Sequence, residues 1–201
     1  MTGGVPPLTP ALLDAYAGRL RGLGVPAVAH LRPGLASAAI ERVLAPSGLR
    51  LPPEAAIWWE WRNGTAAGAA TSPAEREITA SRSFPLALEQ AVAEAARSER
   101  ILRDTRLGQE DVWWPGLLPV LSAPHGALVA VDCAAPATPT SIVYSVDWER
   151  GTLPKAASLG QVVTWWIDAV DTGAYGFDAT AGTWTYDWER LTPAQKASTL
   201  V

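Results

Sequence analysis

The chain has 201 residues, of which 48% are hydrophobic, and this is sufficient for one domain with a sizeable core. Its net charge is −4 with only 16 lysines and arginines, which excludes the strongly basic surface expected of a nucleic-acid-binding protein. The single cysteine excludes an internal disulfide, and the sequence has neither a signal-peptide pattern nor an apolar stretch of roughly 20 residues. We therefore expect a cytoplasmic protein without a nucleic-acid or membrane partner.

The N-terminal part of the chain predicts helices. Residues 1–8 are rich in glycine and proline and are expected to be flexible. Thr9 followed by Pro10 is typical of a helix start, and apolar residues at helical spacing extend this helix to about Arg21. A second, shorter helix is predicted from about Leu35 to Leu44.

A third helix is predicted within residues 49–64, which read LRLPPEAAIWWEWRNG. Two prolines precede it, and Asn63-Gly64 is a typical left-handed stop at the C-terminus of a helix. Trp58 and Trp61 share a face of this helix, whereas Trp59 lies about 100° away from Trp58. We therefore expect one ring of the Trp58-Trp59 pair to face a more exposed side.

Residues 65–76 are dominated by alanine, glycine, threonine and serine, which predicts a loop. Ser83 is placed to cap a long helix that runs from about Phe84 to Arg103. The apolar stripe of this helix is rich in alanine, and its many glutamates and arginines indicate a solvated face.

The stretch from Asp111 to Gly151 has the pattern of consecutive antiparallel strands. Three runs rich in β-branched residues, Val112 to Leu121, Ala127 to Cys133 and Ser141 to Trp148, are separated by turn chemistry. With helical patterns on both sides, this meander at about 112–148 predicts an α+β fold. We expect a single twisted, mostly antiparallel sheet with helices packed around it.

Beyond the meander, Ser158 is placed to cap a helix from Leu159 to about Asp171. Residues 177–187 then have the pattern of a small hairpin, and Thr192-Pro193 begins a last helical turn. We expect residues 9–201 to form a single domain, with a C-terminal hairpin extension over 176–201.

The residues that most often bind metals or catalyse reactions are sparse. The two histidines, His30 and His125, lie apart in sequence, and no histidine or cysteine recurs at ligand spacing, so we expect neither a metal site nor a cofactor. His125 is in a Pro-His-Gly turn, and His30 is expected to be half-buried. Cys133 follows Asp132, whose charge raises a thiol pKa, so we interpret this cysteine as a small core residue.

Known catalytic and phosphate-binding motifs are missing from the sequence, and we expect no catalytic residues and no enzyme. The acidic pairs Asp147/Glu149 and Asp187/Glu189 are typical of turns or strand edges unless a pocket shifts a pKa. An enzymatic function requires the fold to bring His125 to a serine, or to bring two carboxylates into a closed cleft.

Ten tryptophans are the unusual feature of the composition, and six of them form the adjacent pairs Trp58-Trp59, Trp113-Trp114 and Trp165-Trp166. Neighbouring side chains diverge on helices and strands, so either layers on both sides cover such a pair or one ring remains exposed as a binding anchor. On the second interpretation, the candidate partner-binding residues are Trp59, Trp61, Trp113, Trp114, Asp147, Trp148 and Glu149.

The order of several segments resembles the SUKH superfamily, which contains fungal cell-wall assembly regulators and many bacterial immunity proteins. Leu51 to Gly64 is similar to its opening motif, and Val143 to Asp147 is similar to its strand that ends in an acidic residue. A Ser158-capped helix with Trp165-Trp166 follows, so the resemblance covers about residues 35–175. The alanine-rich loop after Gly64 departs from the family pattern.

The resemblance implies an α+β, non-enzymatic binding domain without a cofactor. In bacterial members the activity implied is to hold a cognate toxin in an inactive complex, and the alanine-, proline- and tryptophan-rich composition favours a bacterial origin. The alternative is a regulatory or scaffold module that binds an endogenous protein or a small ligand. The sequence leaves the partner and the oligomeric state open.

Overall fold

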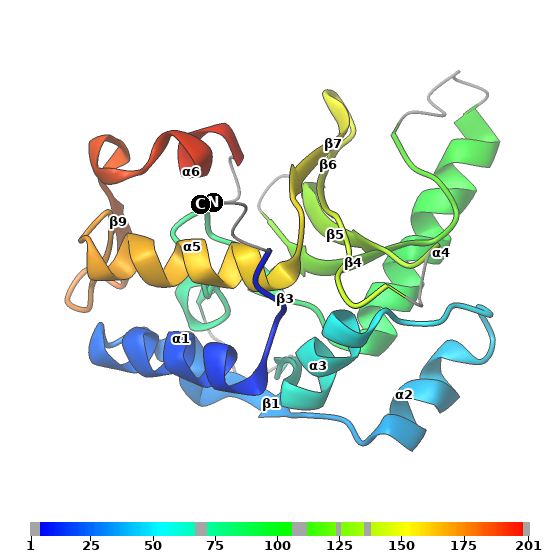
Figure 1. Cartoon of the computed structure of the whole chain (residues 1–201), viewed down its shortest axis with the longest axis horizontal. Helices are drawn as coiled ribbons and strands as arrows, with labels where there is room; N and C mark the ends of the chain where they lie inside the picture. The colour runs from blue at the N-terminus through cyan, green and yellow to red at the C-terminus, as the bar shows by residue number, and fades with distance from the viewer. Residues whose placement is uncertain (1–4, 67–71, 106–111, 124–125, 135–137, 199–201) are drawn as a thin grey trace.

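The computed structural model describes residues 5–66, 72–105, 112–123, 126–134 and 138–198 (Figure 1). These residues combine helices with antiparallel sheets, which confirms the predicted α+β class. In chain order the elements are α1 Pro10–Gly22, η1 Pro26–His30, β1 Leu31–Pro33, α2 Ser37–Leu44, α3 Pro53–Trp61, β2 Arg62–Thr65, η2 Pro73–Glu75, β3 Phe84–Pro85, α4 Leu88–Thr105, β4 Leu117–Ser122, β5 Leu128–Asp132, β6 Val143–Asp147, β7 Gly151–Ala156, α5 Leu159–Asp171, β8 Tyr175–Asp178, β9 Thr183–Tyr186, η4 Trp188–Arg190 and α6 Pro193–Ser198.

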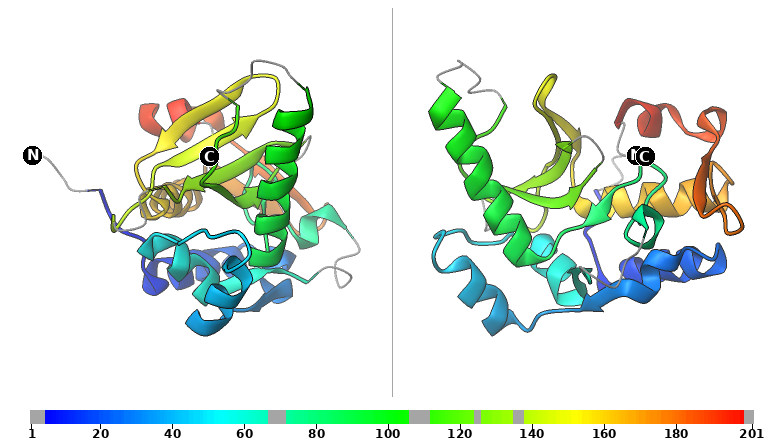
Figure 2. Two further views of the ribbon diagram at one scale, coloured as in Figure 1. Left: turned by 90° about the vertical axis from the view of Figure 1, so that its right-hand side faces the viewer. Right: turned by 180° about the vertical axis from the view of Figure 1, so that it is seen from behind.

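The central sheet has the order β3-β4-β5-β6-β7, with every neighbouring pair antiparallel. It lies between α4 on one side and α5 on the other (Figures 1 and 2). The meander β4-β5-β6 is as predicted, although β4 begins at Leu117 and not at Val112. Strand β7 was not predicted, because its GTLPKA segment is polar and contains a proline. Two further sheets, β1-β2 and β8-β9, contain two strands each.

Local signals placed several elements correctly. The Thr9 side chain accepts a hydrogen bond from the Leu12 amide at the start of α1, and Ser158 does the same for the Gln161 amide at the start of α5. The hairpin β8-β9 and the short helix α6 also lie where the sequence predicts them. In each of these elements a cap or turn residue is close in sequence to the backbone that it satisfies.

The junction of α3 with α4 differs from the prediction in two respects. Asn63-Gly64 does not stop a helix but belongs to β2, and Asn63 Oδ1 accepts a hydrogen bond from the Leu88 amide at 2.8 Å. Asn63 therefore satisfies the first amide of α4, whereas Ser83 lies before β3 and caps nothing there. The helix begins at Leu88, because residues 84–85 pair with β4 as a strand.

Gly64 allows this close approach. It has a φ of +72°, and a Cβ at this position would lie 2.4 Å from the backbone nitrogen of Ala87. A side chain would therefore separate β2 from the segment that leads into α4.

Both rings of the Trp58-Trp59 pair are buried, so the expectation that one faces a more exposed side is wrong. Helix α3 packs against α1, α2 and α5, and it therefore has neighbours on several sides. Trp59 Nε1 donates a hydrogen bond to the Leu86 carbonyl at 3.1 Å, which satisfies this ring in the core. The interpretation that layers cover both members of a pair holds for Trp58-Trp59.

Glu54, in the first turn of α3, has a side chain buried to 1% exposure. Its Oε1 atom accepts hydrogen bonds from the Ser141 amide at 2.5 Å and the Leu159 amide at 3.1 Å. Burial raises the pKa of this carboxyl, and the hydrogen bonds from backbone amides oppose the shift. One carboxyl therefore joins α3 to the segment before β6 and to the N-terminus of α5.

The residues before α1 are also anchored at this junction. Leu8 is buried, and Ser158 Oγ donates a hydrogen bond to the Pro6 carbonyl at 2.8 Å. Leu8 is therefore packed and the Pro6 backbone supplies an acceptor to the start of α5, whereas residues 5–7 are exposed, and the predicted flexibility of residues 1–8 stays a prediction. Residues 1–4 lie outside the described residues.

Replacing Glu54 tests how much the fold depends on this carboxyl. Glu54→Ala leaves the amides of Ser141 and Leu159 without their acceptor, and we expect the free energy of unfolding to fall by about 2–4 kcal/mol. Glu54→Gln retains an acceptor oxygen and should be clearly less destabilising. Urea unfolding measures both, and equal losses for the two variants would contradict the role of the acceptor oxygen.

Gly160 tests the anchoring of the N-terminal segment. A Cβ at this position would lie 2.3 Å from the Pro6 carbonyl oxygen and 2.6 Å from the Leu8 amide nitrogen. We expect Gly160→Ala to lower stability by about 1–3 kcal/mol and to make residues 5–8 sensitive to protease. Gly18→Ala, in an open position of α1, is the matched control and should raise stability by about 0.5–1 kcal/mol.

Candidate interaction surface

The structure divides the predicted partner-binding residues into two groups. Trp59 and Trp113 are 0% and 1% exposed, so neither ring is available at the surface as a binding anchor requires. Trp113 belongs to the segment before β4, in which the Val112 carbonyl accepts a hydrogen bond from Thr152 Oγ1 of β7. This segment lies against the sheet and turns the Trp113 ring into the core.

Trp61 is half-buried and takes part in packing between helices. Its Nε1 atom donates a hydrogen bond to Asp14 Oδ1 of α1 at 2.8 Å, and its ring centroid lies 6.4 Å from that of Trp58. The Arg62 guanidinium lies 5.3 Å from the Trp61 ring centroid. The Trp61 ring thus connects α1 with α3.

Trp114 and Trp148 lie on the α4 side of the sheet. Trp114 packs edge-on against Tyr144 of β6, with the ring centroids 5.0 Å apart and an interplanar angle of 87°. Tyr144 and Val146 share one face of β6, and Val146 pairs with Leu128 of β5. Trp148 lines a groove together with Leu128, so both tryptophans belong to this face.

The groove lies between α4 and the sheet, and its volume is about 630 Å³. Leu86 and Leu128 form apolar parts of its lining, and Trp148 stands beside them as a half-buried ring. Across the groove, Glu94 forms an ion pair with Arg97 at 3.1 Å. This arrangement of an aromatic side chain beside apolar and charged groups is typical of protein-binding sites.

The acidic candidates occupy the turn between β6 and β7. Asp147 Oδ1 accepts hydrogen bonds from the amides of Glu149 and Arg150 at 2.8 and 3.2 Å, so this carboxylate forms the turn. Glu149 is exposed next to Trp148. Asp147 therefore positions the turn, and Glu149 is the acidic side chain presented to solvent.

The free edge of the sheet is less suited to binding than its face. Pro154 lies in the middle of the edge strand β7, opposite Tyr144 of β6. A proline has no backbone amide, so the outer edge of β7 lacks a donor that an added strand would need. The face that contains Trp114, Tyr144 and Trp148, with Glu149, is therefore the candidate interaction surface, and we refer to it below as the Trp148 surface.

Groups with catalytic potential are positioned as ordinary structural residues. Burial, followed by the charge of Asp132, raises the pKa of Cys133 to about 12. His30 is half-buried, as expected, and His125 lies outside the described residues. Within the described residues, no three side chains of histidine, cysteine, aspartate or glutamate are arranged to hold a metal ion, and none of the helices is long and apolar enough to cross a membrane.

Three exposed or half-exposed aromatic residues were not among the binding candidates predicted from the sequence. Tyr144 is the partner of Trp114, and the strict alternation of β6 would have placed it on the opposite face from Val143. Tyr186 and Trp188 are exposed near the C-terminus. Tyr186 and Trp188 are two residues apart at the end of a predicted strand, and this spacing is the sequence signal that could have identified them.

Comparison with known proteins does not assign a class to the chain. No family model matches it, and no curated protein matches it either. The segments on which the expected SUKH resemblance rests lie in α3, β2, β6 and α5 of the structure. They contribute to the core and to the Trp148 surface.

Two tryptophan variants distinguish core from surface. We expect Trp59→Ala to reduce the free energy of unfolding by about 3–5 kcal/mol, because it opens a large cavity and removes the hydrogen bond to Leu86. Trp148→Ala should cost about 1 kcal/mol or less, since its ring is half-exposed. Urea titration measures both values, and a comparable loss for the two variants would show that Trp148 is a core residue.

Proposed function

We propose that the protein is a non-enzymatic protein-binding domain of SUKH type that acts in the bacterial cytoplasm as an immunity protein. It binds a cognate toxin and holds it in an inactive complex. The observation that carries the proposal is the Trp148 surface, where Trp148 lies at a groove and Trp114 packs on Tyr144. Aromatic side chains fixed at a surface supply binding energy at a small cost in conformational entropy.

The charges around the Trp148 surface favour a basic partner. Glu149 is exposed there, and Glu94 lines the groove. Arg97 and Arg150 also belong to this region, but Arg97 pairs with Glu94 and Arg150 with Asp147, so these pairs are close to neutral and the exposed Glu149 carries the negative charge. A basic toxin surface would find the exposed Glu149 carboxylate beside an aromatic centre, and such charge complementarity accelerates association and orients the partner.

The alternative is a regulatory or scaffold module that binds an endogenous protein or a small ligand. A second groove, of about 340 Å³, lies between α2 and α3 and favours this alternative. Ile40, Leu44 and Leu51 form apolar parts of its lining, and Glu41 and Glu60 add two carboxylates. The immunity function predicts that the partner covers Trp148, whereas a small ligand in the second groove would leave Trp148 exposed.

Co-expression with the toxin encoded next to its gene tests the immunity function. We expect the two proteins to co-purify and the chain to protect cells from the toxin. Glu149→Lys should weaken the complex by about tenfold or more, because it places a cation against a basic partner. Trp148→Ala should weaken it by a similar factor.

The control for these variants is Glu41→Lys, the same charge reversal at an exposed position of α2. It should bind the toxin as the parent protein does. Equal weakening by both lysine variants would point to net charge and not to the Trp148 surface. If no neighbouring toxin exists and no partner co-purifies, the immunity function is wrong.

A further inference from the structure

A row of aromatic rings in the C-terminal extension runs from half-buried rings past the buried Tyr175 to two exposed rings. The rings belong to the β8-β9 hairpin and to η4, and consecutive centroids lie 5.6, 6.1, 5.7 and 6.0 Å apart. In contact order they are Phe177, Trp184, Tyr175, Tyr186 and Trp188. Tyr175 is 1% exposed, whereas Tyr186 and Trp188 are 44% and 43% exposed. The buried Tyr175 ring packs against Tyr186, and Tyr186 packs against Trp188, so these contacts support the two outer rings while they face solvent.

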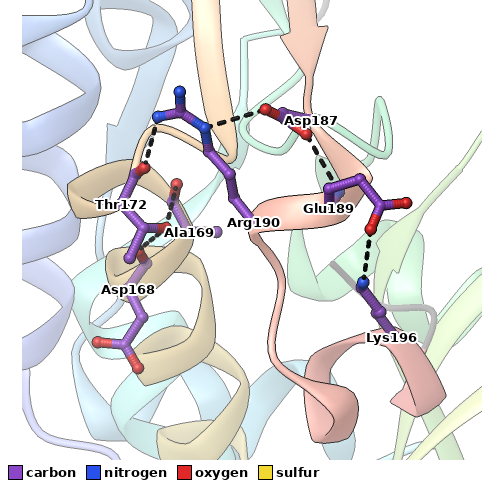
Figure 3. A network of polar contacts seen from close by, with 7 residues as sticks. All are labelled: Asp168, Ala169, Thr172, Asp187, Glu189, Arg190 and Lys196. Atoms are coloured by element: carbon purple, nitrogen blue, oxygen red, sulfur yellow. Dashed lines mark hydrogen bonds and ion pairs between the residues drawn. The ribbon is translucent and has the colours of Figure 1, made fainter.

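Polar contacts hold this part of the extension against α5 (Figure 3). The Arg190 guanidinium donates one hydrogen bond to Asp187 Oδ2 and another to the Thr172 carbonyl at the end of α5, each at 3.0 Å. Gln195 Nε2 donates to the Trp165 carbonyl at 3.2 Å. The outer rings are therefore fixed relative to α5, which lowers the entropic cost of binding to them.

A cationic side chain of the same protein already lies beside the exposed Trp188 ring. Lys196 Nζ lies 5.9 Å from the Trp188 ring centroid. It also forms an ion pair with Glu189 Oε2 at 3.6 Å (Figure 3). An aromatic face beside a carboxylate attracts an ammonium or guanidinium group through both the ring quadrupole and the negative charge. The Glu189 side chain is 86% exposed, so it can also reach a cation outside the molecule.

We propose that Tyr186, Trp188 and Glu189 form a docking site for a cationic side chain, arginine or lysine, of a partner protein. Lys196 is the internal occupant that such a side chain displaces or joins. Arginine fits this site well, because its planar guanidinium stacks on an aromatic ring while it donates hydrogen bonds to a carboxylate. The proposal concerns a surface other than the Trp148 surface and does not depend on the immunity function.

The test is an NMR titration of the full chain at low salt. The probe is an acetylated, amidated peptide with two arginines separated by glycine, and the control peptide contains neutral citrulline in place of arginine. We expect the arginine peptide to shift the indole N–H signal of Trp188, assigned with Trp188→Phe, and the amide signal of Glu189. Equal shifts with the citrulline peptide, or shifts spread evenly over other exposed carboxylates, would overturn the proposal.

Variants then test the competition by Lys196. Lys196→Gln should raise the affinity for the arginine peptide about two- to fivefold, because it removes the internal cation. Glu189→Gln should lower it by a similar factor without changing the shape of the side chain. Glu149→Gln, on the Trp148 surface, should leave it unchanged. Unaltered or weaker binding by Lys196→Gln, or no effect of Glu189→Gln, would contradict the site.

Discussion

The Glu54 carboxyl is the interaction on which the arrangement of the fold depends. Its oxygen joins α3 to the segment that enters β6 and to the first amide of α5, and the start of α5 in turn holds the residues before α1. A buried carboxyl is costly unless hydrogen bonds satisfy it, and here backbone amides donate to Oε1, whereas the buried Oε2 atom has no hydrogen-bond partner among the described residues. Because three segments meet at this one acceptor atom, the carboxyl restricts how they can be arranged, and this structural specificity offsets the cost of burying it. The positions of α3, β6 and α5 relative to one another are therefore tied to this carboxyl.

Elements defined by local chemistry could be predicted from the sequence, and elements defined by tertiary contacts could not. Thr9 and Ser158 cap helices that follow them directly, so α1 and α5 were placed correctly. In contrast, α4 is capped by Asn63 from a distant strand, and β7 exists because β6 pairs with it. For the candidate surface, Trp148 and Trp59 were both predicted as binding residues; the structure leaves Trp148 half-buried, but Trp59 is buried by helices whose positions no local pattern reveals.

The exposed aromatic side chains fall into two separate regions with one common feature. Trp148 and Trp188 are each followed by a glutamate, Glu149 and Glu189, that is exposed beside the ring. In each case the preceding aspartate uses its side chain to accept amides of the turn, which fixes the direction of both the ring and the glutamate. The repeated Asp-Trp-Glu sequence therefore combines a rigid turn with an aromatic ring and a negative charge.

The anchoring of residues 5–8 at α5 also affects how the chain folds during synthesis. The hydrogen bond from Ser158 to the Pro6 carbonyl spans 152 positions, as does the ion pair between Arg19 and Asp171. Neither contact can form until α5 has left the ribosome, so α1 must wait for most of the chain before its buried face is covered. Contacts of such long sequence separation also slow folding, because a large loop has to close before they stabilise anything. During that interval the apolar side of α1, with Leu13, Tyr16 and Leu20, lacks one of the helices that bury it in the folded protein.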